Sequence, residues 1–155
     1  MAAIDFSGTW RTTAARDDVW RVVADLTTWP QWWPAIDEVE MLAGTPEAPE
    51  AARFTFGTPI RPLRIEMAVS AATPGERLDV VTVDGPVRGT GRLDLQDEAA
   101  YTAVAFALRL DIRSRLFKPV ERLLAGAARG DSQRLRKAGD DLSRLAGGEP
   151  GPHDV

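Results

Sequence analysis

The strongest constraint on the fold is a change in hydrophobic period near residue 113. Between residues 36 and 112, apolar and polar side chains alternate in six short segments divided by turn residues, at 36–42, 52–58, 63–71, 78–83, 87–96 and 102–112. A period of two is typical of strands with one buried face. Because the turns are short, we expect consecutive strands to pair in antiparallel fashion.

From about residue 114 to residue 146 the period is helical. The apolar stripe consists of Leu116, Val120, Leu123, Leu124, Ala127, Leu135, Ala138, Leu142 and Leu145. A single helix of this length needs a broad apolar surface on which to pack. The inner face of a curved antiparallel sheet of six to seven strands provides that surface, so the predicted fold class is α+β.

The N-terminal region predicts one strand and two short helices. Residues 3–12 alternate as a half-buried strand. The hydroxyl of Thr13 is suited to cap a helix that runs to about Asp25. Two prolines within residues 27–34 limit the next segment to a short helix, which carries Trp29, Trp32 and Trp33.

The chain length of 155 residues fits one domain. We assign residues 1–146 to that domain. Residues 147–155 are rich in glycine and proline, and we expect them to form a disordered tail in which His153 is exposed to solvent.

Composition excludes several classes of site. The chain has no cysteine and one histidine, which argues against metal centres, disulfides and Ser-His-Asp catalysis. We therefore expect no metal and no cofactor. The net charge of −4 gives no general attraction to nucleic acid. No apolar run is long enough for stable membrane insertion, and the N-terminus does not resemble a signal peptide. A cytoplasmic location follows as an expectation.

Four motifs, in this order, resemble one superfamily. They are Ala14-Ala-Arg-Asp-Asp-Val-Trp20, Trp29-Pro-Gln-Trp-Trp-Pro34, Gly85-Pro-Val-Arg-Gly-Thr-Gly91, and Thr102-Ala-Val followed by the long helix. The chain is similar over residues 3–146 to the SRPBCC (START/Bet v 1-like) superfamily, and within it to the bacterial polyketide cyclase/dehydrase and lipid-transport-like branch. This resemblance implies a helix-grip fold, in which a curved sheet wraps a long C-terminal helix over a cavity.

The resemblance also implies that the cavity binds a hydrophobic, aromatic or lipid-like small molecule. The expected ligand-binding residues lie on the inner phase of the strands, on the tryptophan-rich helix and on the long helix: Trp29, Trp33, Phe54, Phe56, Met67, Val69, Phe106, Leu108, Phe117 and Leu124. The alternation places Arg64, Arg88, Arg92 and Arg109 on the outer face, and Tyr101 at a rim. We therefore predict no catalytic residue, and no charged side chain that projects alone into the cavity of a carrier.

Three functions stay open at this point. The first is binding of a hydrophobic small molecule without catalysis, by a monomer or homodimer. A second is a polyketide aromatase/cyclase in which an arginine or Tyr101 assists. The third is a protein-interaction module that uses residues 113–137, which hold eight basic and two acidic residues. The short helix bounded by Pro30 and Pro34 is a candidate gate to the cavity.

Overall fold

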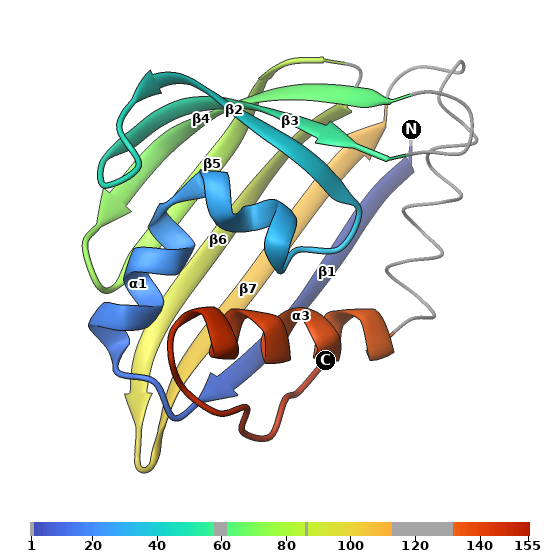
Figure 1. Ribbon diagram of the computed structural model, residues 1–155. Coiled ribbons are helices and arrows are strands. Elements are labelled where there is room, and N and C mark those ends of the chain that lie inside the picture. The colour runs from blue at the N-terminus through green and yellow to red at the C-terminus, as the bar shows by residue number, and fades with distance from the viewer. Residues whose placement is uncertain (1, 58–61, 86, 113–131) are drawn as a thin grey trace.

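The structure is a computed structural model that describes residues 2–57, 62–85, 87–112 and 132–155. Its elements follow the predicted order (Figure 1). They are β1 (Ala2–Thr12), α1 (Arg16–Ala24), η1 (Leu26–Gln31), β2 (Ile36–Gly44), β3 (Pro49–Phe56), β4 (Leu63–Thr73), β5 (Arg77–Asp84), β6 (Val87–Glu98), β7 (Tyr101–Ile112) and α3 (Ser132–Leu145).

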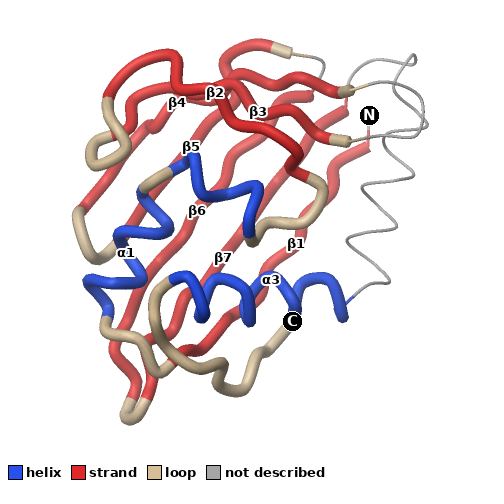
Figure 2. Tube along the Cα trace, viewed as in Figure 1, coloured by secondary structure: helices blue, strands red, loops and turns tan. Residues whose placement is uncertain are grey.

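The seven strands form one antiparallel sheet in the order β1-β7-β6-β5-β4-β3-β2. Strands β2 to β7 pair as consecutive neighbours, as the short turns predicted, and β1 pairs with β7. The helices α1, η1 and α3 lie over the same side of the sheet (Figures 1 and 2). This arrangement confirms the α+β helix-grip fold.

Two strand pairs are irregular, and these irregularities bend the sheet. The β2–β3 register shifts between Ile36 and Glu38, and the β4–β5 register shifts between Val69 and Ala71. Such bulges bend a strand and increase its twist. The bent sheet turns its apolar face toward the helices, where Phe54, Leu78 and Val104 are almost fully buried.

Helix α3 covers part of the segment that the helical period predicted. Its stripe of Leu135, Ala138 and Leu142 packs into the core. The indole of Trp10 on β1 donates a hydrogen bond of 2.8 Å to the carbonyl oxygen of Leu135. Phe117, Leu124 and the other predicted helical positions from 113 to 131 lie outside the described residues.

Three tryptophans, one in η1 and two directly after it, join the core around Trp10. Trp29, Trp32 and Trp33 are all buried, and the ring centroids of Trp32 and Trp33 lie 5.8 and 5.6 Å from that of Trp10. The indole of Trp29 donates to the carbonyl oxygen of Val23 at 3.0 Å, which ties η1 to α1. The short element is therefore anchored by its aromatic side chains.

The predicted cap at Thr13 is wrong. Helix α1 begins after Ala15, which makes no side-chain capping bond. The hydroxyl of Thr13 instead accepts a hydrogen bond of 2.8 Å from the backbone N–H of Glu149. The C-terminal segment competes successfully for this hydroxyl because it runs alongside the end of β1.

Residues 147–155, for which we expected disorder, lie against β1 in the structure. Backbone bridges join Thr9 to Asp154 and Thr12 to Pro150. The side chain of His153 is 5% exposed: its Nδ1 accepts from the backbone N–H of Arg11, and its Nε2 lies 2.9 Å from Asp140 of α3. These bonds satisfy backbone groups that a free sheet edge would otherwise expose to solvent.

Candidate functional site

An apolar cavity of about 110 Å³ lies between the inner face of the sheet and the elements η1 and α3. Its wall is formed by Trp29, Trp33, Pro34, Ala35, Ile36, Phe54, Phe56, Leu63, Ile65, Met67, Val80, Thr82, Val87, Gly89, Thr90, Gly91, Leu108, Leu110, Arg134 and Leu135. Strands β2 to β7 all contribute to it. The cavity is thus where the resemblance placed it.

Six of the predicted ligand-binding residues line this cavity: Trp29, Trp33, Phe54, Phe56, Met67 and Leu108. Val69 and Phe106 are not part of its wall. Phe106 is 2% exposed and stacks on Trp10 with ring centroids 4.2 Å apart, so it fills the core beside the cavity. Val69 packs against the core next to the irregular end of the β4–β5 pairing.

Two glycines on β6, Gly89 and Gly91, border the cavity. A Cβ atom at Gly89 would collide with the backbone carbonyl oxygen of Arg109 and with Leu110. A Cβ atom at Gly91 would lie 3.1 Å from a methyl carbon of Val80 and 3.3 Å from a methyl carbon of Leu108. The alternation of residues 87–96 puts both glycines on one face of a strand, but it does not show that this face borders a cavity.

Three polar side chains interrupt the apolar wall: Thr82, Thr90 and Arg134. Thr82 is 7% exposed, and its hydroxyl oxygen accepts a hydrogen bond of 2.9 Å from the backbone N–H of Gly89. Thr90 is exposed. Arg134, on α3, is also exposed and interacts with other groups of the protein, so it stands at the edge of the cavity.

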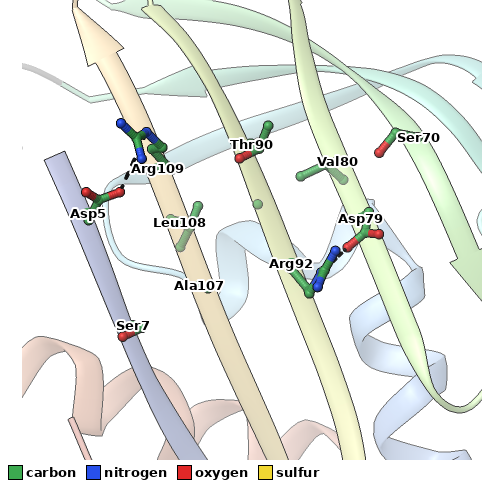
Figure 3. A pocket seen from close by; sticks show the side chains of 11 residues that line it. Asp5, Ser7, Ser70, Asp79, Val80, Thr90, Arg92, Ala107, Leu108 and Arg109 are labelled. Carbon is green, nitrogen blue, oxygen red and sulfur yellow. Dashed lines mark hydrogen bonds and ion pairs between the residues drawn. The ribbon is translucent and has the colours of Figure 1, made fainter. Parts of the chain in front are cut away.

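The outer face of the sheet holds a larger and polar depression of about 770 Å³ (Figure 3). Its charged groups pair with one another. Arg92 donates to Asp79 at 2.9 Å, and Arg109 lies 4.0 Å from Asp5. Arg64, Arg88, Arg92 and Arg109 are all exposed, as the alternation predicted. Tyr101 is half-buried at the end of β7 and does not line the cavity.

Asp79 is the most tightly held of these groups, with a side chain that is 15% exposed. Burial alone would raise the pKa of its carboxyl group. Hydrogen bonds from Arg77 and Arg92, together with their positive charge, outweigh burial and hold the pKa below its ordinary value. The outer face therefore carries a satisfied ion-pair cluster.

Two basic residues of α3 share one acidic partner on the same helix. Lys137 and Arg144 both contact Asp141, at 3.0 Å each. These are exposed pairs at the spacing of one helical turn, which contribute little to stability. None of the described helices combines the length and the apolar character needed to cross a bilayer.

Comparison with known families and structures agrees with this geometry. The profile of the family described as polyketide cyclase / dehydrase and lipid transport matches residues 3–144. A comparison with curated proteins found no match.

Among solved structures, a START superfamily protein from Mycobacterium smegmatis is 19% identical with a TM-score of 0.70, over 92% of this chain and 97% of that one. The Zhui aromatase/cyclase from Streptomyces sp. R1128 is 15% identical with a TM-score of 0.69, over 94% of each chain. A conserved protein from Geobacillus kaustophilus is 14% identical with a TM-score of 0.69, over 98% of this chain and all of that one. At these identities the likeness shows a shared fold.

Proposed function

Since the chain belongs to the polyketide cyclase/dehydrase and lipid transport family, we propose that it binds a hydrophobic small molecule in the inner cavity and releases it chemically unchanged. The chemistry of the wall carries this proposal. General acid–base catalysis needs a side chain that gains and loses a proton near neutral pH. Arg134 is the one ionisable group among the described wall residues, and a guanidinium stays protonated at that pH.

The ligand is compact. Pockets for drug-sized molecules enclose roughly 300–1,000 Å³, whereas this cavity encloses about 110 Å³. An engineered apolar cavity of about 150 Å³ in another protein accommodates benzene. A single ring, flanked by Trp29, Phe54 and Phe56, is the size of ligand that this space favours.

The alternative is an aromatase/cyclase-type enzyme. This name belongs to the Zhui protein, with which the chain shares its fold. Incubation with a bound ring compound, followed by chromatography and mass spectrometry, separates the two functions. We expect the compound to be recovered intact, and protein-dependent conversion would overturn the carrier proposal.

We propose that ligands enter the cavity beside η1, next to Trp29 and Trp33. We also propose that the protein is cytoplasmic and is a monomer or a homodimer. Both indoles line the cavity, Trp29 within the six-residue element η1 and Trp33 just after it. Native mass spectrometry of protein purified from its own host would reveal both a co-purified ligand and the number of chains in the assembly.

A blocking variant tests the site directly. Leu108→Trp places a large ring in the cavity, whereas Ala107→Trp places the same ring on the exposed outer face of the same strand. Isothermal titration with toluene and indole should show binding to the wild type and to Ala107→Trp, and no binding to Leu108→Trp. Equal binding by both variants, with both folded by near-UV circular dichroism, would place the ligand elsewhere and contradict the proposal.

A further inference from the structure

A smaller apolar cavity, of about 20 Å³, lies next to the larger one. Five residues border both spaces: Trp29, Trp33, Val80, Gly91 and Leu108. The remainder of the smaller wall is formed by Leu78, Arg92 and Leu93. A space of this size accommodates roughly one water molecule. The structure that separates the two cavities therefore limits how far a ligand in the larger one can extend.

The floor of the two cavities is built of rows of residues that run across β5, β6 and β7. Residues that pair directly on adjacent antiparallel strands project from the same face of the sheet. One row consists of three buried side chains: Leu78, Leu93 and Phe106. In the next row Val80 pairs with Gly91, and Gly91 pairs with Leu108. This second row has a branched side chain at each end and none in the middle.

The side chains of Val80 and Leu108 close over the gap above Gly91. A Cβ atom on this glycine would lie 3.1 Å from a methyl carbon of Val80 and 3.3 Å from a methyl carbon of Leu108. Carbon atoms in favourable contact are about 3.5–4.0 Å apart. The space directly above Gly91 is thus too narrow for a carbon atom of a ligand, and Val80 and Leu108 form a partition between the cavities.

Val80 is the more rigid half of this partition. Its side chain is buried, and a β-branched side chain has restricted rotation about χ1. Leu108 is half-buried and branches one carbon further from the backbone, so its methyl groups move with less hindrance. A ligand that extends along the cavity therefore meets Val80 as the fixed obstacle.

We propose that Val80 sets the upper limit on the length of the ligand, which is a ring compound with at most a short substituent on the side of the partition. A longer substituent would need the smaller cavity, which the partition closes off. This inference rests on the proposed function, since it specifies which ligands the same site accepts.

Two probes without polar groups test this limit. Toluene and propylbenzene differ by two methylene groups, and each methylene that becomes buried strengthens binding by about fourfold. Isothermal titration of the wild-type full chain should show that propylbenzene binds no more tightly than toluene. Val80→Ala removes half of the partition, so this variant should bind propylbenzene about tenfold more tightly than toluene.

Val81→Ala is the matched control. It makes the same change at the next residue of β5, which borders the outer depression and neither of the two inner cavities. This variant should keep the wild-type ratio of the two dissociation constants. Leu108→Ala opens the partition from β7 and should raise the ratio as well, so the test does not depend on one variant. Near-UV circular dichroism checks that each variant is folded.

The outcomes separate the size limit from the binding function. If the wild type already binds propylbenzene about tenfold more tightly than toluene, or if the folded partition variants keep the wild-type ratio, the size limit is wrong while the binding function stands. An equal rise in the ratio for Val81→Ala also contradicts the assignment to the partition. If the wild type binds neither probe, the binding function itself fails and the size limit fails with it.

Discussion

Two glycines of β6 are closely surrounded by their neighbours. Gly91 and Gly89 face the cavity, but their surroundings differ. An added methyl group at Gly91 would meet the ends of two side chains, those of Val80 and Leu108, which can give way. At Gly89 it would meet the backbone carbonyl oxygen of Arg109, which cannot move without distorting β7.

The two alanine variants should therefore separate binding from stability. Gly91→Ala should weaken toluene binding several-fold, because it narrows the cavity, and should change the free energy of unfolding by less than about 1 kcal/mol. Gly89→Ala should destabilise the protein by about 2 kcal/mol or more. Urea unfolding of both variants and their titration with toluene check this contrast. Equal destabilisation by the two substitutions would show that the surroundings of Gly89 and Gly91 do not differ as described.

Asp79 gives the outer face a dependence on pH. Its folded-state pKa lies below the unfolded value, so its ion pairs stabilise the protein above the unfolded pKa of about 3.9. That contribution is lost as the pH falls through the folded-state pKa. Asp79→Asn should cost about 1 kcal/mol near pH 7, and the difference from wild type should shrink toward zero in strong acid. Urea unfolding of the wild type and of Asp79→Asn near pH 7 and in strong acid checks this prediction. An equal difference in the free energy of unfolding at the two pH values would contradict it.

Sequence reasoning predicted the face of the sheet on which a residue lies more reliably than whether that residue borders the cavity. Alternation predicted that Phe54, Phe106 and Leu108 point inward, and each of them contacts the core or the cavity. Whether an inward residue borders open space depends on what the facing helices already fill. Trp10 fills the space over Phe106, and no pattern in β7 alone indicates this.

At the scale of elements, the C-terminal segment also shows that a local sequence pattern does not reveal partners elsewhere in the chain. Its glycine and proline content predicted disorder, because such a sequence forms neither helix nor sheet of its own. In the structure it uses bonding groups that belong to other elements, namely the free backbone edge of β1 and Asp140 of α3. His153 makes two of these contacts at once, with Nδ1 as the acceptor and the proton on Nε2.

Removal of residues 149–155 should therefore destabilise the protein. The truncation breaks backbone hydrogen bonds at Thr9, Arg11 and Thr13 and the ion pair between Arg11 and Asp154. We expect a loss of about 2–4 kcal/mol in the free energy of unfolding, and a smaller loss for His153→Ala alone. An unchanged urea midpoint in the truncated protein would instead support the disordered tail that the composition predicted.

At the scale of the whole molecule, the order and spacing of the sequence motifs were the main basis for the predicted fold. Each motif is weak alone, but one strand, two short helices, a run of hairpins and a final helix describe few architectures. The topology β1-β7-β6-β5-β4-β3-β2 follows when consecutive strands pair and the first strand closes on the last. The place of Arg134 at the edge of the cavity was not predicted, because α3 and the sheet come together only through tertiary packing.

Ligand binding should stabilise the whole fold in proportion to affinity. A ligand that binds only the folded state adds about 2.7 kcal/mol when its free concentration is 100 times the Kd. Titration of toluene should therefore raise the Tm of the wild type progressively and leave that of Leu108→Trp constant. A parallel rise in both proteins would indicate binding outside the cavity.

The tryptophan cluster has a spectroscopic consequence. Trp10, Trp29, Trp32 and Trp33 have neighbouring ring centroids 5.1–6.0 Å apart, which is close enough for their electronic transitions to couple. At these separations the excited states of neighbouring indoles mix, and excitation passes between the rings before emission. The near-ultraviolet circular dichroism should therefore show an exciton couplet that belongs to no single tryptophan. Replacing one ring by phenylalanine would then alter the whole couplet instead of subtracting a quarter of it.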